Sequence, residues 1–261
     1  MTLITAHRGG AGLWPENSLT AFRGAVGLRG LNAVELDVQA CRDGRLVVFH
    51  DDTLERTSDG SGRLVELDFE TVRRSRLTGT GGEPPPTLDE VLALLVPTRL
   101  ELKLEIKVAD GADADDMVAR SVAATDAHGM TGRTLFMSFD RPAIAALGRL
   151  GRRLAYSVLT SWKADEAEAR MAALVDEALA AHAAAIGVGS KPPDDAAGQL
   201  AARAALIARA RAAGLRAAVW TVNAVDDLRA WLGNDAVDDV TTDWPDRALA
   251  IRDAAGASPW R

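Results

Sequence analysis

Histidines and carboxylates gather in three short apolar segments near the start of this 261-residue chain. The segments are ITAHRGG with His7, AVELDVQ with Glu35 and Asp37, and LVVFHDD with His50. Because side chains alternate along a strand, Glu35 and Asp37 leave the same face. Two carboxylates buried on one face repel each other unless a cation or a basic group lies between them. The pattern therefore predicts a metal site flanked by an acid and a base.

A fourth segment, LELKLEIK (Leu100–Lys107), alternates strictly between apolar and charged residues. In a barrel the outer face of a strand packs against helices, so the charged face would point inward. The alternative is an edge strand with a solvated charged face, but the acidic pair on an earlier strand favours the inward arrangement. Catalytic residues lie at the carboxyl ends of barrel strands, which selects Glu105 and Lys107. We expect the deeper Glu101 and Lys103 to form an interior ion pair.

Glu35, Asp37 and Glu105 offer only oxygen ligands, and no cysteine cluster accompanies them. Oxygen ligands suit a hard divalent ion rather than structural zinc. The sequence therefore predicts that these carboxylates bind Mg²⁺ or Ca²⁺, and the choice between the two ions stays open.

Two histidines and two cations complete the expected site. An unperturbed imidazole titrates near pH ~6.5, so His7 and His50 can hold opposite protonation states and act as base and acid. Arg8 adds a planar fork and Lys107 a point charge, and both groups bind phosphate well. Which histidine is the acid stays open at this point.

Short apolar runs alternate with longer stretches rich in Ala, Leu and Arg. Strands are expected at Leu3–His7, Ala33–Val38, Leu46–His50, Leu100–Lys107, Thr134–Ser138, Arg153–Val158, Ala184–Val188, Arg216–Thr221 and Asp239–Thr242. Helices are expected around Ser18–Leu28, Leu88–Leu95, Ala114–Ala127, Pro142–Leu150, Asp165–Ala181, Leu200–Ala213 and Val225–Leu232. This alternation implies parallel strands with right-handed crossovers. About eight such units in roughly 250 residues predict an α/β fold, the TIM (β/α)8 barrel.

One connection departs from this alternation. Only QACRDGR joins the second and third expected strands, and Asp43-Gly44 within it is a hairpin turn signal. Counting outward from this turn places Asp37 opposite His50. We therefore expect a β-hairpin after the second strand that carries His50 back beside the acidic pair.

We expect a single domain over residues 1–251, followed by a frayed tail over 252–261. The irregular stretch over about 51–86 is too short for a second domain, and we expect it to form a small insertion on the barrel rim. Thr87 is expected to cap the next helix, with Glu90 completing a capping box.

The composition fits a globular protein with a full core, because 48% of the residues are hydrophobic and 26% are charged. The net charge of −7 and the lack of a basic cluster argue against nucleic-acid partners and an electrostatic membrane anchor. The single cysteine, Cys41, cannot form an internal disulfide and lacks the setting of a reactive thiol. With no signal peptide and no long apolar run, we expect a cytoplasmic protein without a membrane span.

Several polar residues lie near these motifs without a decided role. Asn17 is expected to cap the first helix, Glu16 is ambiguous, and Asp243 could either approach the site or cap the last helix. His128 and His182 lie in or beside Ala-rich helices without acidic clusters, so surface or capping roles are expected.

Taken in order, the motifs HRGG, PENS, VELDV, VVFHDDTLERTSDGSG, PTLDEVL, LEIK, VWTVN and TDWPD resemble the glycerophosphodiester phosphodiesterase family. The resemblance runs from His7 to Asp246 and is most specific in the first half. It implies a TIM barrel of the phosphatidylinositol-phospholipase-C-like kind. It also implies metal-dependent hydrolysis of small glycerophosphodiesters to sn-glycerol 3-phosphate and a free alcohol.

The resemblance further implies a role for each motif residue. It assigns catalysis to His7 and His50, metal binding to Glu35, Asp37 and Glu105, and substrate contacts to Arg8, Lys107 and Trp220. Lys103 departs from the family, because many members carry a neutral polar residue there. Members are thought to attack first with the glycerol 2-hydroxyl, and direct attack by water is the open alternative.

Two other functions stay open. A phospholipase-D-like enzyme acting on lysophospholipids would favour an apolar rim, whereas the insertion is rather polar. A barrel that binds phosphodiesters without turnover would be expected to have lost some of the histidines and carboxylates, and all are present. Neither the head group nor the oligomeric state follows from the sequence.

Overall fold

The computed structural model describes residues 2–150, 154–160, 167–189 and 196–256. Within these residues eight parallel strands close into a barrel, because the first strand pairs with both the second and the last. The strands are β1 (Leu3–Ala6), β2 (Ala33–Ala40), β4 (Glu101–Ile106), β5 (Thr134–Ser138), β6 (Ala155–Thr160), β7 (Ala185–Gly189), β8 (Arg216–Trp220) and β9 (Asp239–Thr242). The closed barrel confirms the predicted fold class.

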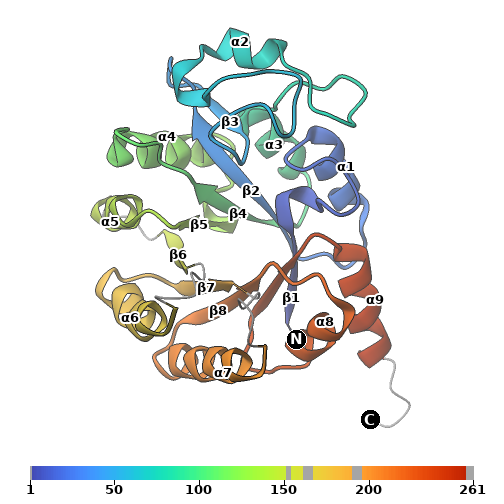
Figure 1. The fold of residues 1–261 in the computed structure, drawn as a ribbon, viewed down its shortest axis with the longest axis vertical. Helices are drawn as coiled ribbons and strands as arrows, with labels where there is room; N and C mark the ends of the chain where they lie inside the picture. The colour runs from blue at the N-terminus through green and yellow to red at the C-terminus, as the bar shows by residue number, and fades with distance from the viewer. Residues whose placement is uncertain (1, 151–153, 161–166, 190–195, 257–261) are drawn as a thin grey trace.

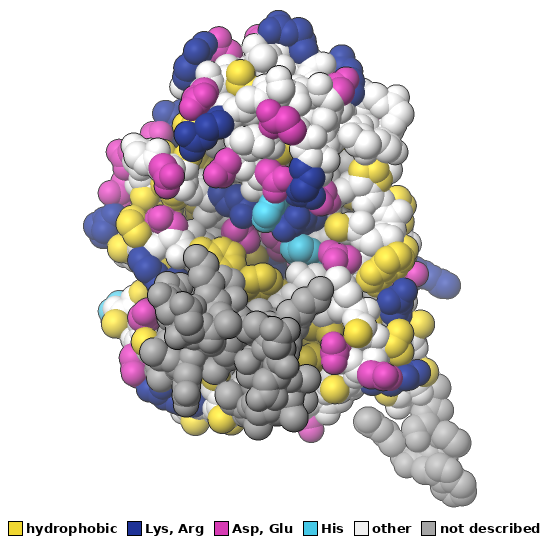
Figure 2. Space-filling model, viewed as in Figure 1, with side chains coloured by type: hydrophobic (Ala, Val, Ile, Leu, Met, Phe, Trp, Pro, Cys, Tyr) yellow, Lys and Arg dark blue, Asp and Glu magenta, His cyan; other side chains and the backbone are white. Residues whose placement is uncertain are grey.

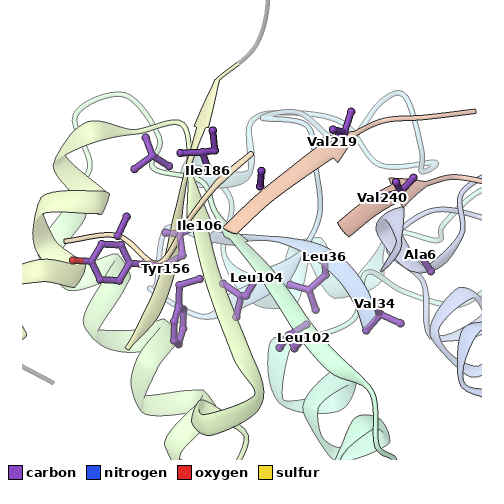
Figure 3. Close-up of a cluster of buried hydrophobic side chains, with 14 of the residues drawn as sticks. Ala6, Val34, Leu36, Leu102, Leu104, Ile106, Tyr156, Ile186, Val219 and Val240 are labelled. Carbon is purple, nitrogen blue, oxygen red and sulfur yellow. The ribbon is translucent and has the colours of Figure 1, made fainter. Parts of the chain in front are cut away.

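Helices surround the barrel on its outside (Figure 1). They are α1 (Leu19–Gly27), α3 (Leu88–Leu95), α4 (Ala114–Ala127), α5 (Arg141–Arg149), α6 (Ala167–Ala180), α7 (Ala196–Ala212), α8 (Val225–Leu232) and α9 (Pro245–Gly256). Leu102, Leu104 and Ile106 of β4 are buried in the main hydrophobic core with side chains from the other strands (Figure 3). Fully burying one such side chain contributes roughly 1.5–3 kcal/mol, so the apolar face of LELKLEIK fixes its charged face inward.

The last helix extends into the segment that was expected to be a frayed tail. Helix α9 continues through residues 252–256 of the expected tail. Residue 153, residues 165–166 and residues 257–261 of the expected elements lie outside the described residues. In the part of the chain that the structure describes, no helix has both the length and the apolar character to cross a bilayer.

The expected hairpin is present, with a different register. Strand β3 (Leu46–Val48) runs antiparallel to β2 and stands outside the closed barrel. The N–H of Phe49 donates to the carbonyl of Asp37 at 3.0 Å, so the predicted pairing of Asp37 with His50 was wrong by one residue. The cause is Gly44, which at φ 79° adds a left-handed residue to the turn, as in a G1 bulge. His50 consequently lies just beyond β3.

The stretch after His50 forms a small folded layer on the hairpin, with a 3₁₀ turn at Leu64–Glu66 and α2 at Phe69–Arg74 (Figure 1). It has its own hydrophobic cluster, which consists of Cys41, Val47, Phe49, Leu54, Leu64, Val72 and Leu77. The layer ends at the predicted capping box, since Thr87 and Glu90 cap α3 reciprocally. Residues directly after His50 are therefore held by packing as well as by the chain.

A buried ion pair inside the barrel differs from the predicted one. Lys103 pairs with Asp239 of β9, and both side chains are 6% exposed. The predicted pair of Glu101 with Lys103 was wrong, because Glu101 begins β4 and is exposed. Asp239 also accepts a hydrogen bond from the Thr5 hydroxyl at 2.8 Å. The barrel interior therefore contains a buried ion pair whose two charges balance each other.

We expect Lys103→Met to lower the free energy of unfolding by about 3–5 kcal/mol, because it leaves the Asp239 carboxylate buried without its cation. Lys103→Met combined with Asp239→Asn should recover most of that loss. Urea unfolding followed by circular dichroism measures both values. Arg23→Met is the control, since the Arg23–Glu83 pair is exposed on the arginine side and should change stability by less than about 1 kcal/mol. Equal losses of stability in Lys103→Met and Arg23→Met would contradict the assignment of a buried Lys103–Asp239 ion pair.

Candidate active site

The carboxyl-terminal ends of the strands surround one pocket, where active sites of this barrel type lie. One side of the pocket carries charged residues from the β1, β2, β3 and β4 ends, and the other side is apolar. The charged or titratable lining residues are His7, Arg8, Glu35, His50, Lys103 and Glu105, and the large apolar ones are Met137, Phe139, Leu159 and Trp220. Figure 2 shows histidine side chains among acidic and basic ones in a hollow of the surface, with a hydrophobic patch beside them.

Three carboxylates meet in this pocket. Glu35, Asp37 and Glu105 each offer one oxygen within 4.8 Å of the others. Asp37 and Glu105 are register partners on β2 and β4, so the sheet itself places them side by side. Burial and the charge of Asp37 raise the pKa of Glu35 to about 7, and the same two causes raise the pKa of Glu105. Buried oxygen donors with this mutual repulsion fit a hard divalent cation.

Two basic side chains contact the carboxylates. Arg8 Nε lies 3.3 Å from Asp37 Oδ2, while Lys107 Nζ lies 3.3 Å from Asp37 and 2.8 Å from Glu105. Burial alone would raise the pKa of Asp37, but Lys107 and Arg8 hold that pKa below its ordinary value. Arg8 and Lys107 therefore reduce the negative charge of the carboxylate cluster. Both side chains could also contact an anion that binds beside the cluster.

The turn after β1 places His7 and Arg8 over the pocket. Arg8 and Gly9 have φ angles of 50° and 81°, and the Arg8 N–H donates to Glu35 Oε2 at 2.8 Å. A Cβ on Gly9 would lie 2.8 Å from the Cβ of Ala21, which is too close for any other residue. Glycine therefore lets α1 pack directly against the turn.

His7 is oriented by a carboxylate from the far end of the chain. Its Nδ1 lies 2.6 Å from Asp243 Oδ1, and Asn223 donates to the other oxygen of Asp243 at 2.5 Å. Because a carboxylate accepts hydrogen bonds, Nδ1 carries the proton and Nε2 is left for the pocket. Burial lowers the pKa of His7, but the hydrogen bond to Asp243 and the charge of Glu35 outweigh it, so that pKa is raised. Asp243 therefore belongs to the site.

His50 has a similar partner that the sequence reasoning missed. Its Nδ1 lies 2.6 Å from Asp51 Oδ1, and Arg56 donates to the same carboxylate at 2.9 Å. The hydrogen bond from Arg56 lowers the pKa of Asp51 to about 2. The pKa of His50 is lowered, mainly by burial and despite the charge of Asp37. An acidic residue directly after His50 was the signal for this pair.

The PENS segment also reaches the site. Asn17 donates to Asp37 Oδ2 at 2.9 Å, and Ser18 rather than Asn17 caps α1. The predicted cap at Asn17 was wrong because its φ of 53° is incompatible with the extended backbone of a cap, although asparagine tolerates the left-handed region. Glu16 accepts a hydrogen bond from Arg8 at 2.8 Å.

The apolar side of the pocket is centred on Trp220. The rings of Trp220 and Phe139 pack edge to face, with centroids 5.4 Å apart and an interplanar angle of 82°. Within the described residues the buried indole Nε1 of Trp220 has no hydrogen-bond partner. This wall therefore presents apolar surface to the pocket.

The structure thus brings together every residue that the sequence selected for the site. His7, Arg8, Glu35, His50, Glu105 and Trp220 line the pocket, while Asp37 and Lys107 contact this set through the carboxylate cluster and its ion pairs. Asp51, Asp243, Asn17 and Glu16 complete the site by orienting these residues.

Comparisons with known proteins agree with one another over nearly the whole chain. Residues 7–247 match the model of the glycerophosphoryl diester phosphodiesterase family. The glycerophosphodiester phosphodiesterase of Bacillus altitudinis is 28% identical over 97% of this chain and 99% of its own. A solved structure from Agrobacterium tumefaciens, described as a candidate glycerophosphoryl diester phosphodiesterase, has a TM-score of 0.85 at 29% identity and covers 98% of this chain and 99% of its own.

A third similar protein was solved with a bound product. This Oleispira antarctica phosphodiesterase, in complex with sn-glycerol 3-phosphate, has a TM-score of 0.82 at 25% identity and covers 97% of both chains. The family match includes both histidine segments and the three carboxylates described above. The chain therefore belongs to the glycerophosphoryl diester phosphodiesterase family.

Proposed function

We propose that the chain hydrolyses small glycerophosphodiesters to sn-glycerol 3-phosphate and an alcohol. It does so with Mg²⁺ or Ca²⁺ bound by Glu35, Asp37 and Glu105. One observation carries the proposal: three buried carboxylates meet in the same pocket as two histidines that are each oriented by an aspartate. The product bound by the Oleispira antarctica relative supports the glycerol 3-phosphate half of the substrate.

The residues of the pocket divide the work between them. Arg8 and Lys107 hold the phosphate oxygens through charge-assisted hydrogen bonds. When bound, the cation supplies electrophilic stabilisation of the charge at phosphorus and lowers the pKa of the attacking hydroxyl. His7 and His50 act through Nε2, one taking the proton of the attacking group and the other protonating the departing alcohol. Trp220 lines the side of the pocket that excludes water.

A second substrate class follows from the apolar wall of the pocket, formed by Met137, Phe139, Leu159 and Trp220. Lysophospholipids carry a glycerophosphodiester with an acyl chain, and an apolar wall would accommodate part of that chain. The polar insertion on the rim favours the small substrates, so we expect choline to be released more slowly from lysophosphatidylcholine than from glycerophosphocholine.

We expect His7→Ala and His50→Ala each to lower kcat by at least about 100-fold, because each removes a proton-transfer group. A coupled assay of glycerol 3-phosphate release from glycerophosphocholine and glycerophosphoethanolamine measures the loss, and circular dichroism checks the fold. His128→Ala is the control, since His128 follows α4, pairs with the exposed Asp89 and does not line the pocket. Turnover that survives either active-site substitution would refute the acid–base assignment.

Removal of the cation should abolish turnover, and Mg²⁺ or Ca²⁺ should restore it. We expect Glu105→Gln to raise the metal concentration needed for half-maximal activity at least about 10-fold, because a ligand charge is lost. Glu101→Gln changes an exposed carboxylate on the same strand and should leave the metal dependence unchanged. Calorimetric titration of the protein, after a chelator has removed its metal, measures metal binding directly. If Glu105→Gln and Glu101→Gln bound the metal with equal affinity, the assignment of Glu105 as a metal ligand would be refuted.

Asp243→Asn tests the orientation of His7. The hydrogen bond and charge of Asp243 raise the pKa of His7, so their loss lowers that pKa. We expect the limb of the pH profile of kcat/KM that His7 governs to move to lower pH, and kcat to fall at least about 10-fold. Asp253→Asn, a change at an exposed carboxylate, should leave both limbs in place. A limb that stays fixed or moves to higher pH in Asp243→Asn would contradict this role.

A further inference from the structure

Building on the proposed hydrolysis, we propose that Arg56 is a positioning residue that holds His50 and Arg8 in their working places. Arg56 lies in the insertion and touches no substrate-binding wall of the pocket. Its guanidinium instead bridges two carboxylates, because it donates to Asp51 at 2.9 Å and to both oxygens of Glu16 at 2.8 Å.

Each of the two carboxylates contacts one group of the site. Asp51 holds His50 Nδ1 at 2.6 Å, and Glu16 holds Arg8 Nη1 at 2.8 Å. Arg8 in turn lies 3.3 Å from Asp37. One guanidinium therefore stands at the centre of a chain of charged contacts that runs from a proton-transfer histidine to a carboxylate of the proposed metal site.

The chemistry of this position requires an arginine. Without the cation, Asp51 and Glu16 would present two negative charges to each other, and their repulsion would draw Asp51 away from His50. A guanidinium is a planar fork with five donors, so it can bind two carboxylates bidentately, whereas a lysine ammonium acts as a point charge. Lysine at position 56 would neutralise the charge without fixing both carboxylates.

The backbone around Arg56 is placed firmly enough to serve this role. Leu54 is 1% exposed in the hydrophobic cluster of the insertion. The N–H of Ser58 donates to the carbonyl of Leu54 at 3.1 Å, and the N–H of Thr78 donates to the carbonyl of Thr57 at 2.9 Å. The insertion thus holds Arg56 against the rim of the barrel, where its guanidinium can fix the positions of His50 and Arg8.

Kinetics of three variants test the proposal. We expect Arg56→Met to lower kcat about 10–100-fold, as loss of a supporting partner does, and Arg56→Lys to recover part of that loss. Arg63→Met is the matched control, because Arg63 belongs to the same insertion and its side chain is 43% exposed, against 47% for Arg56. The control should stay within about twofold of wild type, since its pair is a surface one.

Two further measurements separate positioning from stability and from the proposed function. Glu16→Gln should raise KM more than it lowers kcat, because it frees Arg8 while Asp51 keeps His50 in place.

Nitrogen-15 NMR of the metal-free protein should show the Nδ1–H form of the His50 imidazole in wild type and a larger Nε2–H population in Arg56→Met. The NMR measurement needs no turnover, so it tests the role of Arg56 even if wild type hydrolyses none of the substrates. An inactive wild type would refute the proposed function and leave the positioning of His50 by Arg56 to be decided by NMR. An unchanged His50 tautomer, or a kcat in Arg56→Met equal to that of Arg63→Met, would overturn the proposal.

Discussion

Repulsion among three buried carboxylates is the constraint to which the rest of the site responds. The pairing of β2 with β4 puts Asp37 beside Glu105, so the barrel cannot separate them without losing its register. Compensation comes from Arg8, Lys107 and the amide of Asn17. Each of these groups lies on a different loop. The turn after β1, the PENS segment and the end of β4 therefore meet at the carboxylate cluster, beside which we have proposed that the phosphate binds.

The two histidines show how one pocket creates two different imidazoles. Both have Nδ1 bound by an aspartate at 2.6 Å, so their orientation is alike. Their surroundings differ: Glu35 and Asp243 raise the pKa of His7, whereas burial lowers that of His50, to which Lys107 also contributes. Groups with opposed shifts in one site are suited to exchanging protons in opposite directions.

The sequence predicted the barrel and the selected site residues because both depend on local patterns. Strict alternation in LELKLEIK determines which face is inward, and parallel strands bring their carboxyl ends together. The hairpin register failed at Gly44, because one left-handed residue shifts every partner after it. Arg56 and Asn17 were missed because their roles depend on contacts with segments distant in sequence. The partner of Lys103 was missed for a similar reason, since Asp239 lies across the barrel from β4.

The contact between His7 and Asp243 joins the two ends of the barrel, because His7 follows β1 and Asp243 follows β9, and these strands pair with each other. During translation the first strand emerges long before the last one. A nascent chain therefore cannot orient His7 until residue 243 has left the ribosome and the barrel has closed. The proton transfer proposed for His7 therefore requires a chain that extends through Asp243, and shorter fragments lack the carboxylate that orients this imidazole.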